Sequence, residues 1–288
     1  MLTAQPSFAA IELTVSDGIA TVVFNHPPLN LLDIVMMNDL AELGLWLEQQ
    51  GSISVVVFES ADEAFFIAHA DLTMLEGMKL PDAKDVCEPS LHQMVVDRFA
   101  NLPQLTIGKI RGVARGGGSE FLLALDLRYG ALERTVLGQP EVALGFPPGC
   151  GATQRLPRLV GRTHALEAIL GGMDFSAVEA ERIGWLTRAL PDHLLDDFVL
   201  RFSKQVASYP RHAIVEAKAA INQAHAPMQD GLSFEFAAFL RAFAQNEARS
   251  RVRTALSNGF QTREIEAQAL DHWLLDLNNK DRTEREIL

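Results

Sequence analysis

Two glutamates that follow glycine-rich or turn segments are the residues of this chain best suited to chemistry. Gly116–Gly118 precede Glu120, and a Gln-Pro turn precedes Glu141 about one supersecondary unit later. Glycines let backbone N–H groups approach a ligand closely, and a helix that follows them begins with unpaired N–H donors. Two carboxylates in one apolar pocket resist simultaneous ionisation, so one can hold a proton while the other accepts one. The pattern predicts a site that polarises a carbonyl group and moves protons beside it.

Each part of this pattern also has a purely structural interpretation. Glu120 could complement a helix dipole or complete a capping box, and Glu141 could pair with an arginine at a surface turn. The apolar run Phe121–Leu125 favours the functional interpretation, because it predicts a buried helix with an enclosed acidic start. A nucleophilic Ser119 is disfavoured, because the second glycine of a nucleophile elbow is missing. The glycines match no nucleotide-binding motif, and the histidines lack the spacing of a zinc site.

The composition limits the kind of protein that this chain can be. Its 288 residues, 48% hydrophobic and 22% charged, are typical of one large globular domain with an appendage. A net charge of −12 disfavours a nucleic-acid or polybasic membrane surface. Cys87 and Cys150 cannot build a disulfide framework. No basic residue precedes Lys79, and no apolar run is long enough to span a bilayer, so we expect a cytoplasmic protein.

Strand and helix signals alternate through the first two thirds of the chain. An Asp-Gly turn between two β-rich runs predicts a hairpin. The expected strands are 11–15, 19–24, 54–58, 105–110, 127–130 and 135–137, and the expected helices are 32–49, 91–99 and 119–125. A loop from Met74 leads into the second of these helices, and strand signals fade after Ser176. We therefore expect an α/β core of repeated β-β-α units at 1–205 and an α-helical C-terminal region at 206–288.

Six segments together resemble the crotonase (enoyl-CoA hydratase/isomerase) superfamily over roughly residues 10 to 225. They are Pro28–Leu31, Phe66–Leu72, Gly112–Asp126, Gly138–Gly145, Pro148–Gly161 and Ala217–Asn222. The resemblance implies a crotonase-like spiral of β-β-α units that assembles as a homotrimer or hexamer. It also implies that the C-terminal region serves oligomerisation and covers the active site.

The resemblance implies an activity as well. Members bind acyl-CoA thioesters and polarise the thioester carbonyl between two backbone N–H groups, which here match Ala70 and Gly117. Members that hydrate enoyl-CoA use two glutamates, so Glu120 would activate the water and Glu141 would protonate Cα. Further matching positions are expected to contact the substrate or its CoA part: Pro28, Ala68, Asp71, Leu72, Gly116, Pro140 and Gly149. The implied protein is an enoyl-CoA hydratase of fatty acid metabolism, without a metal or a cofactor other than the CoA of its substrate.

Other interpretations of the activity, and of the residues that depart from the family pattern, stay open. Double-bond isomerisation, hydration with C–C cleavage, decarboxylation, and non-catalytic acyl-CoA binding are alternatives within the superfamily. His69 replaces a usual glycine, and its ring either points outward, stacks on a neighbour, or contacts the adenine side of CoA. Ala152 also replaces a common glycine. The usual C-terminal pattern is not recognisable; Arg249, Arg251 and Arg253 there either contact the CoA phosphates or form a solvated surface.

Overall fold

A computed structural model describes residues 4–75, 88–225, 241 and 245–257, and its contacts divide the chain into two compact units. Unit 1 comprises Met1–Ser203 and unit 2 comprises Lys204–Leu288. This division falls inside one helix, close to the boundary expected at 205. The function expected of 206–288 stays a prediction.

Unit 1 is built on two sheets. The larger sheet has the order β1-β2-β3-β5-β7-β10, and the smaller one has the order β4-β6-β8-β9. The strands of the larger sheet are β1 (Ile11–Ser16), β2 (Ile19–Phe24), β3 (Val55–Ser60), β5 (Leu105–Ile110), β7 (Leu127–Ala131) and β10 (Arg188–Leu190). Those of the smaller sheet are β4 (Phe65–Ile67), β6 (Val113–Arg115), β8 (Val136–Gly138) and β9 (Asp174–Ser176). Only β1–β2 and β8–β9 pair antiparallel among these strands, so the expected α/β class is confirmed.

The expected hairpin is present, with Asp17 and Gly18 in its turn. Both residues have positive φ, 52° and 75°, as a two-residue turn between twisted strands requires. The expected strands at 54–58, 105–110, 127–130 and 135–137 are also confirmed. Strand signals fade after Ser176 in the sequence, and this pattern missed β10, which extends the larger sheet by pairing with β7. This strand has only three residues and is partly exposed, so it lacks a continuous apolar signal.

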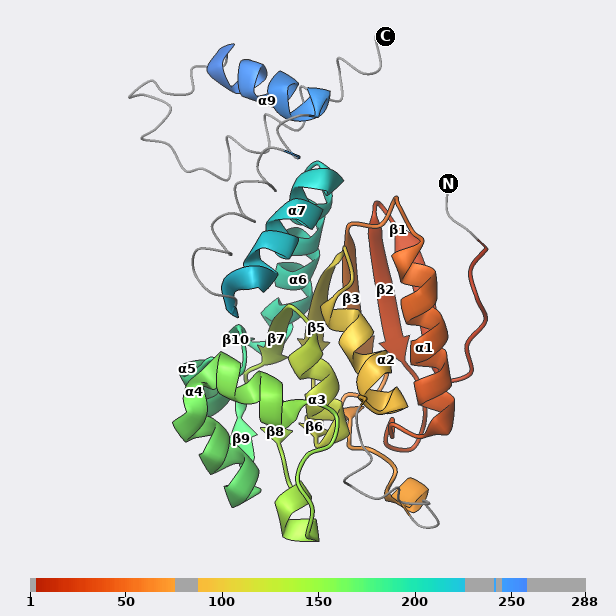
Figure 1. Ribbon diagram of the computed structural model, residues 1–288, viewed down its shortest axis with the longest axis vertical. Coiled ribbons are helices and arrows are strands. Elements are labelled where there is room, and N and C mark those ends of the chain that lie inside the picture. Colours follow the sequence, from red (N-terminus) through yellow and green to blue (C-terminus); the bar gives the residue numbers. More distant parts are fainter. Residues whose placement is uncertain (1–3, 76–87, 226–240, 242–244, 258–288) are drawn as a thin grey trace. The chain divides into compact units, whose positions relative to one another are not determined.

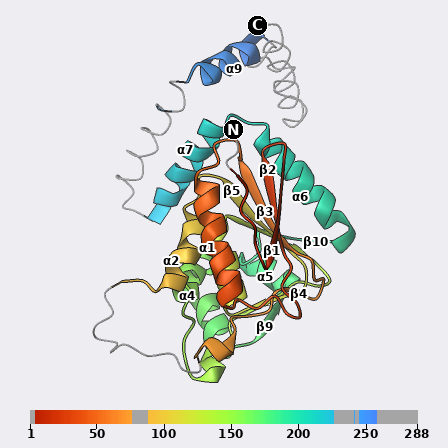
Figure 2. The same ribbon diagram turned by 90° about the vertical axis from the view of Figure 1, so that its right-hand side faces the viewer.

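Helices cover both faces of the larger sheet. Those of unit 1 are α1 (Ile34–Glu48), α2 (Leu91–Ala100), α3 (Gly117–Ala124), α4 (Ala152–Gly171), α5 (Ala177–Ile183) and α6 (Asp192–Ala207, which ends in unit 2), with the 3₁₀ turns η1 (Leu72–Leu75) and η3 (Glu141–Leu144). Figure 1 shows α1 and α2 side by side in front of the sheet, and Figure 2 shows α6 on its other side. The rings of Tyr129 on β7 and Phe198 on α6 lie 5.1 Å apart. Unit 2 contains α7 (Arg211–Asn222), η4 (Gln223–His225) and α9 (Asn246–Ser257).

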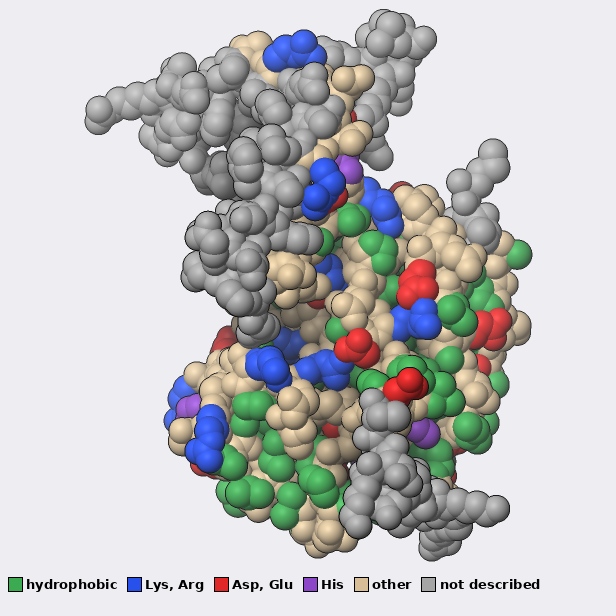
Figure 3. All heavy atoms as spheres, viewed as in Figure 1, with side chains coloured by type: hydrophobic (Ala, Val, Ile, Leu, Met, Phe, Trp, Pro, Cys, Tyr) green, Lys and Arg blue, Asp and Glu red, His purple; other side chains and the backbone are tan. Residues whose placement is uncertain are grey.

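Several apolar side chains of unit 1 lie exposed along and just after α4. Exposed leucines lie there at positions 159, 166 and 170, and Met173 follows them. Figure 3 shows apolar side chains gathered at the lower left, where Figure 1 places α4 and β9. None of the described helices is long and apolar enough to cross a membrane.

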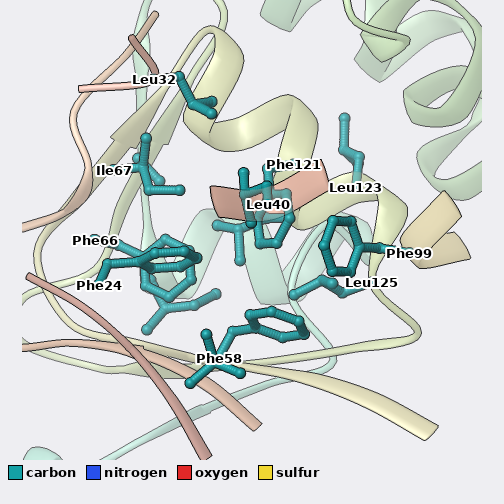
Figure 4. Close-up of a cluster of buried hydrophobic side chains, with 14 of the residues drawn as sticks. Phe24, Leu32, Leu40, Phe58, Phe66, Ile67, Phe99, Phe121, Leu123 and Leu125 are labelled. Carbon is teal, nitrogen blue, oxygen red and sulfur yellow. The ribbon is translucent and has the colours of Figure 1, made fainter. Parts of the chain in front are cut away.

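A cluster of fully buried phenylalanines fixes α3 against the larger sheet. Phe121 of α3 lies 5.7 Å from Phe24 on β2, 5.3 Å from Phe58 on β3 and 5.2 Å from Phe99 on α2, measured between ring centroids (Figure 4). All three contacts are edge-to-face, the favoured geometry of aromatic pairs. Because Phe121 follows Glu120 directly, this packing holds the helix that carries the first glutamate.

A buried arginine caps the other end of α3. The guanidinium of Arg128 donates hydrogen bonds to the carbonyl oxygens of Leu122 (3.2 Å), Leu125 (2.6 Å) and Trp185 (2.9 Å). The last carbonyls of a helix lack the amide donors that interior turns supply, so Arg128 adds donors at the buried end of α3 and ties it to the backbone of Trp185. Burial lowers the pKa of Arg128 to about 10, so the side chain still carries its charge at neutral pH.

Replacing Arg128 by Met is expected to lower the free energy of unfolding by about 2–3 kcal/mol, because buried carbonyl oxygens lose their donors. Chemical denaturation of Arg128→Met and the wild type measures the difference. Arg162→Met serves as the control, because Arg162 is exposed. Equal stability of all three proteins would contradict the capping role of Arg128.

Candidate active site

Glu120 lies in the first turn of α3 and is clamped by the loop that precedes α4. Its Oε1 accepts hydrogen bonds from the backbone N–H groups of Cys150 (2.7 Å) and Ala152 (3.0 Å). Only 3% of Glu120 is exposed. Burial raises the pKa of Glu120 above its ordinary value, whereas the two amides and the nearby guanidinium of Arg155 act to lower it. The loop therefore favours the carboxylate form of Glu120 and opposes the effect of burial.

Glu141 begins η3 and is also buried, with 8% exposed. Burial raises its pKa to about 7, and the charge of Glu120 contributes in the same direction. Gln139 holds the carboxyl group. In the amide orientation that satisfies its neighbours, its nitrogen donates to both carboxyl oxygens of Glu141 at 3.2 Å and its oxygen accepts from Ser119 Oγ at 3.1 Å. The two glutamates are thus held by different groups within electrostatic reach of each other.

The two carboxyl groups of the expected acid–base pair have different environments. A carboxyl group with a pKa near neutral exchanges protons readily at neutral pH, which suits a general acid or base. Glu141 meets this condition. Glu120 has amide donors that favour its charged form. When two carboxyl groups have different environments, their pKa values differ, so that one is suited to donate a proton and the other to accept one.

The backbone geometry around Ala70 leaves its N–H group available. Leu32 and Ala70 form a parallel bridge, in which Leu32 N donates to His69 O (3.0 Å) and Asp71 N donates to Leu32 O (3.1 Å). In such a bridge the central residue directs its own N–H group away from the partner strand. A Cβ atom added at Gly117 would lie 3.3 Å from Ala70 N, so the start of α3 lies beside this N–H group. Gly117 is the first residue of α3, so its N–H group also has no acceptor within the helix.

Each of the three glycines is needed for a different reason. Gly116 has φ of 45°, and a Cβ there would lie 2.8 Å from Oε1 of Glu141. A Cβ at Gly117 would crowd Ala70, and one at Gly118 would overlap the carbonyl group of Ile67. The triplet therefore lets the start of α3 approach β4, Ala70 and Glu141 at once. This close approach brings together Gly116, Gly117, Ala70 and Glu141, as expected from the sequence.

The other expected contact residues lie near this centre or on the surface around it. The backbone of Ala68 joins two loops, since its N–H donates to Leu29 O (3.2 Å) and its carbonyl accepts from Arg115 N (3.0 Å). Pro140 caps η3, whereas Pro28, Leu72 and Gly149 are exposed. Asp71 binds the N–H and hydroxyl groups of Thr73, so its carboxylate holds a turn. Contact of these residues with a substrate stays a prediction.

The structure shows contacts for some of the residues that depart from the family pattern, and others lie outside the described residues. His69 Nδ1 lies 2.9 Å from the carbonyl oxygen of Ala70, so the ring holds the backbone of its neighbour. Its expected alternative contact with the adenine side of CoA stays a prediction. Ala152 keeps the amide that binds Glu120. Arg253 is exposed, and the side chains of Arg249 and Arg251 lie outside the described residues, as does Cys87.

The structure adds functional residues that the sequence pattern did not single out. Gln139 lies two residues before Glu141 in the Gly-Gln-Pro-Glu segment, and this position is the only feature of the sequence that points to a role for it. The amides of Cys150 and Ala152 carry no side-chain signal at all. Ser119 is fully buried, and its hydroxyl donates to the side-chain oxygen of Gln139 in the amide orientation given above. Among the described residues, no group of three His, Cys, Asp or Glu side chains could hold a metal ion.

Glu141→Gln is expected to stabilise the protein at alkaline pH. The raised pKa means that the folded protein holds the Glu141 proton more tightly than the unfolded chain does. This stabilisation is fully present below pH 4.5, the pKa of an unperturbed glutamate, and is lost as the pH rises through about 7. Glutamine does not ionise, so the variant should exceed the wild type by on the order of 1–2 kcal/mol near pH 8 and by much less near pH 5. Denaturant titrations at both pH values measure this, and a pH-independent difference would contradict the raised pKa.

Comparison with known proteins places this geometry in a family. The family model for enoyl-CoA hydratase/isomerase matches residues 14–260, which extends past the expected limit of 225 into the divergent C-terminal region. A Dictyostelium discoideum protein named "Probable enoyl-CoA hydratase, mitochondrial" is 30% identical over 234 residues, covering 80% of this chain and 81% of that protein. A Rhizobium meliloti protein named "Probable enoyl-CoA hydratase" is 31% identical over 246 residues, covering 84% and 92%.

A solved structure agrees with these relatives. The crystal structure of an enoyl-CoA hydratase from Bacillus anthracis is 29% identical, has a TM-score of 0.79, and covers 87% of this chain and 96% of that chain. The match thus holds for the sequence over most of the chain and for the arrangement of its sheets and helices. The chain belongs to the enoyl-CoA hydratase/isomerase family, within the crotonase superfamily.

Proposed function

We propose that this enzyme is an enoyl-CoA hydratase of fatty acid metabolism, which adds water across the 2,3 double bond of an enoyl-CoA thioester. The observation that carries the proposal is the pair of buried glutamates: Glu141 has a pKa of about 7, and Glu120 is clamped by amides that favour its charge. Hydration needs one group that takes a proton from water and another that gives a proton to carbon. The two environments suit these two tasks.

In the proposed reaction, the N–H groups of Ala70 and Gly117 donate to the thioester oxygen. Negative charge develops on that oxygen when water adds to the β-carbon, and fixed N–H dipoles stabilise it without rearranging. Glu120 accepts a proton from the attacking water as the C–O bond forms, and Glu141 donates a proton to the α-carbon. The two transfers add one water in total, and a proton then returns from Glu120 to Glu141. Coenzyme A takes part only as a portion of the substrate.

Isomerisation of the double bond is the second candidate, because the family includes isomerases. Moving a double bond requires one group that shuttles a single proton, whereas both carboxyl groups are present, buried and held by hydrogen bonds here. The pair therefore favours hydration over isomerisation and decarboxylation. Incubation with crotonyl-CoA should remove the absorbance of the conjugated thioester without release of free CoA thiol. Persistent absorbance over a panel of enoyl-CoA chain lengths, with acyl-CoA bound, would support a non-catalytic binding subunit instead.

We also propose that the chain assembles as a homotrimer or hexamer. The exposed leucines of α4 and Met173 form an apolar surface on unit 1 that association would remove from water. Sedimentation equilibrium measures the mass of the assembly, and a monomer would contradict this part of the proposal. The expected cytoplasmic location stays a prediction.

A further inference from the structure

Arg155, in the first turn of α4, connects α2 to the loop that clamps Glu120. Its Nη2 binds Oδ1 of Asp97 on α2 at 2.6 Å, and its Nη1 donates to the carbonyl oxygen of Cys150 at 3.3 Å. The side chain of Arg155 is 22% exposed, whereas that of Asp97 is 60% exposed. The guanidinium therefore lies mostly inside the protein, between a surface carboxylate and the backbone of the active-site loop.

The conformation of Gly151 ties the guanidinium to the same loop. Gly151 has φ of 116°, in the region that favours glycine, and a Cβ there would overlap Nη1 of Arg155. Gly151 lies between Cys150 and Ala152, whose amides bind Glu120. The guanidinium thus packs directly on the segment that supplies both hydrogen bonds. A change at Arg155 should therefore disturb the clamp on Glu120 without touching Glu120 itself.

Arg155 also supplies a positive charge to the site. The titratable groups that face Glu120 are Glu141 at the start of η3, the thiol of Cys150 in the loop, and Arg155 of α4. On α2, which packs against α3, Asp97 is bound by Arg155, and Arg98 is bound by Glu48 of α1. Burial and the two glutamates raise the pKa of the Cys150 thiol to about 12, so this thiol is neutral at physiological pH. The charge on Arg155 opposes the effect of burial, which raises the pKa of Glu120.

We propose that Arg155, anchored by Asp97, is a positioning residue that holds the Cys150–Ala152 loop in the shape that clamps Glu120 and keeps Glu120 ionised for catalysis. The catalytic part of this inference rests on the proposed hydratase function. Its electrostatic part concerns the protein without substrate and can be tested separately.

The first measurement follows the ionisation of Glu120 in substrate-free protein. Carbon NMR of protein labelled at the glutamate carboxyl carbons reports the pKa, and the signal of Glu120 is assigned by its loss in Glu120→Gln. Arg155→Gln should raise the pKa of Glu120 by about one unit, because an opposite charge that favours the carboxylate is removed. An unchanged pKa in folded Arg155→Gln would overturn the inference.

The second measurement is the pH dependence of crotonyl-CoA hydration. Arg155→Gln should move the acidic limb of kcat toward higher pH by about one unit and lower the plateau of kcat about tenfold, with little change in KM. Arg155→Lys keeps the charge, so it should restore the acidic limb. It should recover only part of the plateau, because an ammonium group lacks the planar fork that reaches both partners. A full plateau in Arg155→Lys would overturn the loop-holding role, and this variant serves if Arg155→Gln does not fold.

Arg158→Gln is the matched control. Arg158 lies on the same helix, is exposed, and donates to the carbonyl oxygen of Gln154 at 2.6 Å. It should leave the pH profile and the pKa of Glu120 unchanged, and an equal shift in this variant would overturn the specific role of Arg155. If the wild type does not hydrate enoyl-CoA while Arg155→Gln still shifts the pKa of Glu120, the proposed function fails and the positioning role stands.

Discussion

Glu120→Gln is expected to lower kcat for crotonyl-CoA hydration by about 10³-fold, within the range of a lost general acid or base. Glutamine has nearly the same shape, and its carbonyl oxygen can still accept the hydrogen bonds from Cys150 and Ala152. It cannot take a proton from water. KM should change little, because the substrate and the anion-binding N–H groups are untouched. Initial rates over a range of crotonyl-CoA concentrations measure both constants.

The partner variant tests whether the two glutamates act as a unit. Glu141→Gln should lower kcat by a similar factor, and the double variant should be only slightly slower than either single one, since groups that act together are non-additive. Glu167→Gln is the control, because Glu167 lies exposed on α4. A loss of less than tenfold in both single variants would contradict the acid–base pair.

Ala70→Pro is expected to lower kcat by about 10²–10³-fold while the protein stays folded. Proline lacks the N–H group, and loss of one donor to a developing oxyanion typically costs this much. The fold does not use this N–H group in the bridge with Leu32, which runs through His69 O and Asp71 N. The melting temperature should therefore fall far less than the activity. Steady-state kinetics and thermal melts of the same preparation measure both.

Ala70→Gly separates the donor from the side chain. Glycine keeps the N–H group and removes only the methyl group that lies near Gly117. It should retain most of the activity. Equal losses in Ala70→Gly and Ala70→Pro would show that the methyl group, and not the N–H group, matters for the rate.

Both glutamates and the main elements could be predicted from the sequence, because their signals are local. Glu120 follows three glycines and precedes an apolar run, and the hairpin is signalled by Asp17-Gly18. The short strands β4 and β6 each have three residues, which are too few to show the alternation of apolar and polar residues that marks a strand. They are nevertheless the strands that bring Ala68 and Arg115 together.

The groups that hold the glutamates could not be predicted, because they depend on contacts between distant segments. The clamp on Glu120 comes from backbone amides about 30 residues away, and amides are present at almost every residue. Arg155 lies within a family-like segment, yet its role appears only once Asp97 and Cys150 are next to it. Likewise, the raised pKa of Glu141 follows mainly from burial in the folded protein.

The central claim is that this enzyme adds one water to an enoyl-CoA. Mass spectrometry of the product formed from crotonyl-CoA in ¹⁸O-labelled water tests it most directly. The account predicts a 3-hydroxyacyl-CoA that is heavier than the substrate by one labelled water, with the CoA thioester intact. A converted product with the mass of the substrate would show isomerisation, and a lighter acyl group would show cleavage of a carbon–carbon bond after hydration; either result would contradict the account.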